Sequence, residues 1–330
     1  MRAIVIDRFG GPGELRAADL PRPEPQAGEV LVRVACAGVN PADWKTREGL
    51  LARYIDYRFP FVLGFDVAGV IESVGPGVET FKPGDRVFGT SMQGQGIDGS
   101  YAEYTRCHAA LLVPVPANLT FAEAAALPTA GTTAYGSLVD AGALKAGQTV
   151  LIHGGAGGVG GLAIQIARAA GARVAVTCSA AKIGYVRSLG AELAIDYRTQ
   201  DVAAAVRAWM PDGVDLVLDA VGLDTLAAQA SRLVKRGGRF VEVETLLSAA
   251  SDAQKAEAAA HGVTVVSNMV AVARLPMHLA SLARLVAEGG VRPPPIERLP
   301  LGDAALAHER VQSGQVRGKL VLEVDEAQRG

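Results

Sequence analysis

A glycine-rich stretch, LIHGGAGGVGGLAIQIA, lies between an apolar run and an alanine-rich helical pattern in the middle of the chain. Gly154, Gly157 and Gly160 have GxxGxxG spacing and follow an apolar run over 149–154. Glycine at such positions permits a tight turn, lets a phosphate approach the backbone and lets the helix pack on the strand, while N–H groups at the helix start hold the anion. The stretch therefore predicts a strand, a phosphate-binding turn and a helix closed by Gly171.

The elements around this turn predict the fold class. From Phe121 onward, alanine-rich helical patterns alternate with short apolar strands. We expect helices over 121–127, 128–139, 158–171, 180–189, 201–209, 224–234, 249–260 and 272–288, and strands over 149–154, 173–178, 193–196, 214–222, 238–244 and 263–267. This alternation implies right-handed βαβ units and an α/β fold with a doubly wound parallel sheet.

The chain before residue 120 has a different texture. Proline and glycine break it into short β-branched runs such as EVLVRVACAGV, DVAGVIESVG and DRVFG, which is typical of an all-β, barrel-like domain. The tail returns to a strand, helix, strand pattern, and we expect it to rejoin the first domain. Because 330 residues exceed the usual size of a single core, two domains are expected, with bounds of 1–122 plus 294–330, and 123–293.

Charge and cysteine content limit the partners and the compartment. Lys and Arg number 32 against 34 Asp and Glu, so the net charge of −2 gives no basic field for nucleic acid or an anionic membrane. Three widely spaced cysteines predict neither a disulfide framework nor a zinc knuckle. Charged residues near the start argue against a secretory leader, and no apolar run reaches the roughly 18 residues of a membrane span. We expect a cytoplasmic protein with a small-molecule partner and no nucleic-acid or membrane partner.

The end of the second strand of the predicted sheet indicates which dinucleotide is bound. NAD sites place an acid there against the ribose 2′-hydroxyl, but this strand ends VTCSAAK. Ser179 and Lys182 follow it, and Tyr197 and Arg198 follow the third strand, a set that suits a 2′-phosphate. NADPH is therefore favoured, with ordinary solvated charges at Lys182 and Arg198 as the alternative.

The other predicted cofactor contacts lie in the turn and at strand ends. The turn contributes Gly154, Gly155, Ala156, Gly157, Gly158, Val159 and Gly160. The segments DAVG and VEVE end two further strands at the carboxyl edge, where such sheets bind ligands, and they add Ala220, Val221, Val243 and Glu244. The terminal segment VRGKL adds Arg317 and Lys319 near the nicotinamide or the substrate.

Motifs along the whole chain resemble those of one known superfamily. They are AGVNPADWKTREG, PFVLGFDVAGVIESVGPGVETFKPGDRVFG, GSYAEY, AAALPTAGTTAYGSL, IHGGAGGVG and RGKLVLEV. The chain resembles the medium-chain dehydrogenase/reductase superfamily, and within it the zinc-independent quinone oxidoreductases similar to zeta-crystallin. The resemblance implies a GroES-like β-barrel catalytic domain, a Rossmann NADP-binding domain and a homodimer that forms by edge pairing, for which VTVVS is a suitable strand.

The resemblance also bears on zinc. Zinc alcohol dehydrogenases of this superfamily have a cysteine at the position of Asn40, a histidine at that of Phe65 and a second cysteine near Thr129. An amide, a phenyl ring and a hydroxyl do not make such a site, and the four-cysteine structural lobe is missing because 91–111 contains only Cys107. No metal is therefore expected, and alcohol oxidation lacks its Lewis acid.

Hydride transfer to an acceptor that is already electrophilic needs no metal. A quinone or an α,β-unsaturated carbonyl qualifies, because the developing negative charge needs only hydrogen-bond donors or solvent protons. The predicted function is an NADPH-dependent quinone or enone reductase that works by orientation and water exclusion in an interdomain cleft. The alternatives are a zeta-crystallin-type nucleotide-binding protein with little turnover and, less favoured, a zinc alcohol dehydrogenase.

The resemblance and the residue types together give the catalytic candidates. By resemblance, Asn40 lies near the nicotinamide ribose and the substrate, and Thr129 lies near the nicotinamide. In the loop expected after Asn40, we identify Lys45, Tyr54 and Tyr57, together with Arg47, as candidate donors to the acceptor oxygen.

One carboxylate, Asp66, stands within the apolar run PFVLGFDVAG. It could be a general acid or base, a metal ligand or a buried hydrogen-bond acceptor, and burial without partners would cost several kcal/mol. With no zinc beside it, we expect Asp66 to be a hydrogen-bonded structural residue.

Overall fold

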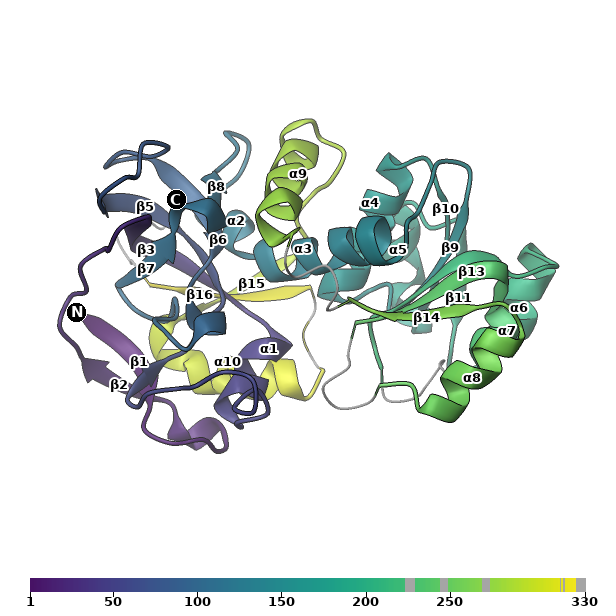
Figure 1. Ribbon diagram of the computed structural model, residues 1–330, viewed down its shortest axis with the longest axis horizontal. Helices are drawn as coiled ribbons and strands as arrows, with labels where there is room; N and C mark the ends of the chain where they lie inside the picture. Colours follow the sequence, from purple (N-terminus) through teal and green to yellow (C-terminus); the bar gives the residue numbers. More distant parts are fainter. Residues whose placement is uncertain (223–228, 244–248, 269–273, 315, 317, 325–330) are drawn as a thin grey trace. The chain divides into compact units, whose positions relative to one another are not determined.

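The computed structural model describes residues 1–222, 229–243, 249–268, 274–314, 316 and 318–324 (Figure 1). The chain forms two compact units. Unit 1 consists of Met1–Ala130, Leu279–Ala287 and Pro293–Gly330, and unit 2 consists of Gly131–His278 and Glu288–Arg292. The domain bounds expected from the sequence stay a prediction.

Unit 2 is built on a six-stranded parallel sheet with the strand order β11-β10-β9-β12-β13-β14. Its strands are β9 (Thr149–His153), β10 (Arg173–Cys178), β11 (Leu193–Asp196), β12 (Val214–Asp219), β13 (Val234–Glu242) and β14 (Thr264–Ser267). In chain order this is 3-2-1-4-5-6, the doubly wound arrangement, so the predicted fold class is confirmed. The order reverses between β9 and β12, whose carboxyl ends lie at the same edge of the sheet.

Helices cover both faces of this sheet (Figure 1). They are α4 (Gly158–Ala169) and α5 (Ile183–Leu189) on one face, and α6 (Val202–Trp209), α7 (Ala230–Leu233) and α8 (Asp252–Ala260) on the other. The unit boundaries fall within two further helices, α3 (Pro128–Gly136) and α9 (Leu275–Ala287). The first residues of each helix belong to one unit and its last residues to the other. Leu151, Val217 and Phe240 are fully buried in the core of unit 2.

The helix predicted over 224–234 is partly wrong. Val234 opens β13 and pairs with Val214 of β12, because a β-branched side chain fits a buried sheet position better than a helix end. Residues 223–228 lie outside the described residues, as do Glu244, Arg317 and the start of the helix predicted over 272–288. The predicted edge strand is confirmed as β14, the last strand in the described sheet order.

Unit 1 contains two sheets. The three-stranded sheet has the order β2-β1-β4, from β1 (Arg2–Ile6), β2 (Arg16–Asp19) and β4 (Phe61–Val62). The seven-stranded sheet has the order β15-β16-β3-β5-β6-β8, and β7 also pairs with β3. Its strands are β3 (Glu29–Val39), β5 (Asp66–Val74), β6 (Arg86–Thr90), β7 (Tyr104–His108), β8 (Leu112–Pro114), β15 (Ile296–Pro300) and β16 (Lys319–Glu323). The predicted return of the tail is confirmed, because β16 pairs with β3.

The helices of unit 1 include one that the sequence analysis missed. They are α1 (Pro41–Arg47), α2 (Phe121–Ala125) and α10 (Ala304–Gln312). The loop predicted after Asn40 is wrong for Lys45 and Arg47, which belong to α1. The signal was present: Asn40 is an N-cap, proline follows it, and Asp43 completes a capping box by accepting the Asn40 N–H over 2.7 Å.

No helix in the described part of the chain is long and apolar enough to cross a membrane. The three cysteines, Cys36, Cys107 and Cys178, are free, buried thiols. Burial raises the pKa of the Cys36 thiol to about 12. Cys36 is therefore a packing residue with little thiolate character.

Candidate functional site

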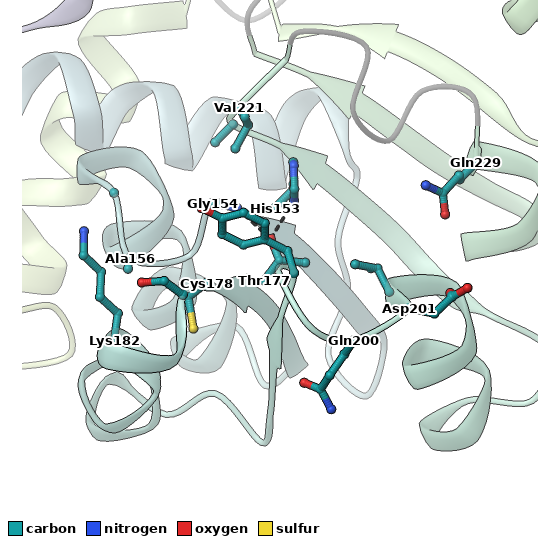
Figure 2. A pocket seen from close by; sticks show the side chains of 15 residues that line it. His153, Gly154, Ala156, Thr177, Cys178, Lys182, Gln200, Asp201, Val221 and Gln229 are labelled. Carbon is teal, nitrogen blue, oxygen red and sulfur yellow. Dashed lines mark hydrogen bonds between the residues drawn. The ribbon is translucent and has the colours of Figure 1, made fainter. Parts of the chain in front are cut away.

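A pocket of about 710 Å³ lies at the carboxyl edge of the unit 2 sheet, where the strand order reverses (Figure 2). The ends of three strands line it: His153 at the end of β9, Thr177 and Cys178 at the end of β10, and Ala220 just after β12. Open parallel sheets bind ligands in the crevice at such a reversal. This pocket is therefore the candidate cofactor site.

Three glycines shape the turn in this pocket for different reasons. Gly154 has φ of +79°, a conformation that L side chains rarely adopt. A β-carbon at Gly160 would lie 2.3 Å from the Gly154 carbonyl oxygen, so α4 can pack on the turn only with glycine there. A β-carbon at Gly157 would lie 3.4 Å from that oxygen, which is ordinary contact. The protein itself leaves room for a side chain at 157, and glycine keeps that room open for a ligand.

The start of α4 offers N–H groups to an anion. Its N-cap residue is Gly157, which makes no side-chain cap. The N–H groups of the first helical turn and the positive end of the helix dipole favour a phosphate at this position.

Thr177 fixes the turn from the neighbouring strand, a role that the sequence analysis missed. Its Oγ1 accepts the Gly154 N–H over 3.1 Å and its carbonyl oxygen accepts the Gly155 N–H over 3.0 Å. His153 Nδ1 lies 2.6 Å from the same Oγ1 (Figure 2). His153 is thus a hydrogen-bonded strand-end residue, and burial lowers its pKa.

The residues predicted to select NADPH lie in the same pocket. Ser179, Lys182 and Tyr197 all line it. Lys182 stands at one side of the pocket, and Asp201 and Gln229 stand at the other (Figure 2). An ammonium and a hydroxyl after β10, where NAD sites carry an acid, make a set that can hold a phosphate on the ribose.

The structure brings together most of the predicted cofactor residues of unit 2. Those that line the pocket are Gly154, Ala156, Gly157, Ser179, Lys182, Tyr197, Ala220 and Val221. Gly155, Gly158, Val159 and Gly160 form the turn and the first turn of α4. Val243 is not among the residues that line the pocket; its N–H donates to the Asp219 carbonyl at the end of β12 over 3.0 Å. Six residues that line the pocket were not predicted: Thr177, Cys178, Gln200, Asp201, Val202 and Gln229. A position at the end of a strand was the signal for Thr177 and Cys178.

In unit 1, three predicted residues meet around Asp66, and we call Asn40, Asp66, Thr129 and Lys319 the Asn40 cluster. Asp66 is fully buried and hydrogen-bonded, as expected. Its Oδ1 accepts the Thr129 N–H over 2.8 Å and the Thr129 Oγ1–H over 2.5 Å, and its Oδ2 accepts Asn40 Nδ2–H over 2.8 Å. Lys319 Nζ donates to Asn40 Oδ1 and, over 3.0 Å, to the Val39 carbonyl. Burial raises the pKa of Asp66 and lowers that of Lys319, and each charge opposes the other's shift.

A second buried network adjoins this cluster at Asp43. Burial raises the Asp43 pKa to about 7, although the N–H groups of Asn40 and Phe65 oppose the shift by donating to the carboxylate. Burial, and then the Arg47 charge, lower the pKa of His308 to about 3. His308 is therefore neutral, so Nδ1 accepts from Arg47 over 3.3 Å and Nε2 donates to the Tyr101 hydroxyl over 3.2 Å. This network ties α1 to α10.

The other catalytic candidates differ in exposure. Lys45 on α1 is buried, and burial lowers its pKa to about 8. Tyr57 is also buried; its hydroxyl lies near Thr46 but makes no hydrogen bond of normal geometry among the described residues. Tyr54 is 64% exposed, so its side chain lies on the surface of the unit. The structure thus separates Tyr54 from the buried candidates.

The side chains in the described part of the chain do not favour a metal site. Within the described ranges, no group of three or more His, Cys, Asp or Glu side chains is placed to hold a metal ion. Asn40 and Thr129, two of the residues at former ligand positions by resemblance, both hydrogen-bond to Asp66. The donor set of amide, hydroxyl and carboxylate, with the Lys319 ammonium against it, does not suit zinc.

Two family descriptions match the chain. Residues 26–117 match the alcohol dehydrogenase GroES-like domain, and residues 189–322 match the zinc-binding dehydrogenase family. The first match lies within unit 1, and the second lies mainly in unit 2.

Known relatives match much or nearly all of the chain. Human quinone oxidoreductase is 34% identical over 98% of this chain and 97% of that protein. The chloroplastic NADPH-dependent alkenal/one oxidoreductase of Arabidopsis thaliana is 39% identical over 73% of this chain, and the match spans only 62% of that relative's length. A mycobacterial protein solved in complex with NADPH is 32% identical, with a TM-score of 0.85 over 98% of this chain and 100% of that chain.

Two glycine variants test the shape of the turn. Gly160→Ala is expected to lower the free energy of unfolding by about 1–3 kcal/mol, because its β-carbon would overlap the Gly154 carbonyl. Gly157→Ala, the matched control, is expected to change it by less than about 1 kcal/mol. Urea denaturation followed by circular dichroism measures both, and equal losses would contradict the packing described for the turn.

Proposed function

Because the chain belongs to the medium-chain dehydrogenase/reductase family, in its quinone oxidoreductase group, we propose that it is an NADPH-dependent reductase of quinones or α,β-unsaturated carbonyls. The observation that carries the proposal is the unit 2 pocket, where the glycine-rich turn, the start of α4 and Lys182 converge. The names of the relatives support the acceptor class.

The residues of the pocket fit NADPH. The turn and the start of α4 would hold its pyrophosphate, and the open room at Gly157 is the space that this group needs. Ser179, Lys182 and Tyr197 would hold the 2′-phosphate. When bound, NADPH supplies a hydride from its nicotinamide ring. Asn40, Thr129 and Lys319 stay proposed contacts at the nicotinamide end, on the basis of the family resemblance.

The proposed chemistry uses no zinc. A quinone or an enone accepts a hydride without a Lewis acid, provided that donors stabilise the charge that develops on its oxygen. Asn40 is the proposed donor to that oxygen, and Lys45 is the proposed source of the proton that completes the reduction. Tyr57 and the exposed Tyr54 stay weaker proposals for the same role.

A cytoplasmic location and a homodimer also stay proposals. Three buried thiols suit a reducing compartment. The position of β14 at the end of the described sheet order leaves a strand that a second copy could pair with.

Lys182→Ala tests the cofactor assignment. It is expected to weaken NADPH binding about 10- to 100-fold, because one charge-assisted hydrogen bond of roughly 1.5–3 kcal/mol is lost. NADH, which has no 2′-phosphate, should bind with unchanged affinity. Fluorescence titration measures both, with the exposed Lys145→Ala of the same unit as the matched control. Unchanged NADPH affinity in Lys182→Ala would overturn the assignment.

The pH dependence of turnover tests Lys45. The ammonium form is lost as pH rises through the lowered pKa of about 8, so kcat should fall above that pH. Lys45→Met should lower kcat by about 100-fold or more near pH 7 and abolish this alkaline limb. Lys82→Met, at an exposed lysine of unit 1, is the control. An alkaline limb that persists in Lys45→Met would assign the proton to another group.

A further inference from the structure

Charged residues of unit 1 hold the side-chain amide of Asn40 at both ends. Its Oδ1 accepts from the ammonium of Lys319, and its Nδ2 donates to Asp66 Oδ2 over 2.8 Å. An ammonium has only donors and a carboxylate only acceptors, so a single orientation of the amide satisfies both neighbours. One Nδ2 proton therefore points at Asp66, and no acceptor in the described part of the chain takes the other.

Asp66 is itself fixed by donors on both oxygens. Two donors of Thr129 meet Oδ1, while Asn40 Nδ2 and, at 3.9 Å, Lys319 Nζ face Oδ2. An arrangement made only of donors is that of an ionised carboxylate. The Asn40 amide therefore lies between a cation, which can only donate hydrogen bonds, and an anion, which can only accept them.

The sheet ladder sets the places of these residues. Asn40 follows β3, Asp66 begins β5 and Lys319 begins β16. Strand β3 pairs with both neighbours, and Gly38 lies opposite Asp66. Since the ladder already joins the three strands, the two buried charges are not needed to hold them together.

Stability alone does not explain this ion pair. Asp66 and Lys319 are 0% and 5% exposed, and burying such charges costs several kcal/mol each, so that apolar residues of similar size often stabilise a protein at least as well. The charges do provide orientation and polarisation of the amide. With a cation on its oxygen, the remaining N–H becomes a stronger donor in surroundings that hold little water.

We propose that Asp66 and Lys319 are positioning residues that hold Asn40 so that its second Nδ2 proton donates to the carbonyl oxygen of the acceptor. This inference rests on the proposed function. When a hydride adds to the β-carbon of an enone, the C=C electron pair shifts toward the carbonyl carbon and the C=O pair moves onto oxygen. Protonation of the α-carbon then restores the carbonyl, and NADP⁺ remains. A donor aimed at that oxygen binds more strongly as its charge grows.

Single and double variants test the proposal with methyl vinyl ketone and benzoquinone as acceptors. At saturating NADPH, Asn40→Ala and Lys319→Met should each lower kcat for the ketone by about 10- to 100-fold. The loss should be smaller with benzoquinone, because its reduced oxygen is less basic and needs less stabilisation. Because Lys319 acts through Asn40, the double variant should lose no more than Asn40→Ala alone. Lys319→Arg, which keeps the cation, should recover most of the kcat.

Several outcomes would overturn the proposal. They are additive losses in the double variant, equal losses with both acceptors, or no loss in Lys319→Met. Lys82→Met is the matched control in unit 1. If Lys319→Met does not fold, Asp66→Asn replaces it among the single and double variants. An amide at position 66 can both donate and accept, so it no longer fixes the orientation of the Asn40 amide. A wild-type protein that reduces neither acceptor would instead contradict the proposed function.

Discussion

A carboxylate with no exposed surface needs hydrogen-bond donors around it, and Asp66 imposes this demand on unit 1. Its hydrogen-bond donors are Asn40, just after β3, and Thr129 in α3, and the Lys319 ammonium at the start of β16 lies 3.9 Å from its Oδ2. Removing any one of them would leave a buried charge incompletely compensated, at a cost of several kcal/mol. The return of the C-terminal segment to the first sheet is therefore the step that completes the cluster.

In unit 2 the strand order of the sheet determines which residues lie together in the pocket. The reversal of strand order between β9 and β12 brings the ends of β9, β10 and β12 to one pocket. Within it, Thr177 of β10 fixes the turn that follows β9. His153, Thr177 and Cys178, which line this pocket, thus lie at strand ends, where the backbone holds them in place and the side chains stay available.

Local signals made much of this predictable from the sequence. The alternation of strand and helix patterns predicted the parallel sheet, and the glycine spacing predicted the phosphate turn. The absence of an acid after β10 directed attention to Ser179 and Lys182. Each of these signals depends only on neighbours in the chain. The helix α1 was missed although its Asn-Pro-x-Asp capping signal is local, since the polar and aromatic residues that follow, 44–48, resembled a loop.

Features that depend on distant partners were beyond sequence reasoning. The meeting of Lys319 with Asn40 requires the register between β16 and β3, which no local pattern encodes. Tyr54 and Tyr57 have the same side chain three positions apart, yet one is exposed and the other buried, because tertiary packing against Phe9 and Phe61 decides their exposure.

The reaction that we propose for this protein is hydride transfer from NADPH to an electron-poor acceptor without a metal. It is tested most directly by dialysing the protein against a zinc chelator, confirming by mass spectrometry that zinc is absent, and following NADPH absorbance with a quinone and with an enone. NADPH should be oxidised at an undiminished rate with at least one of the two acceptors. Oxidation that appears only after zinc is restored would contradict it, and binding of NADPH without oxidation would identify a nucleotide-binding protein instead.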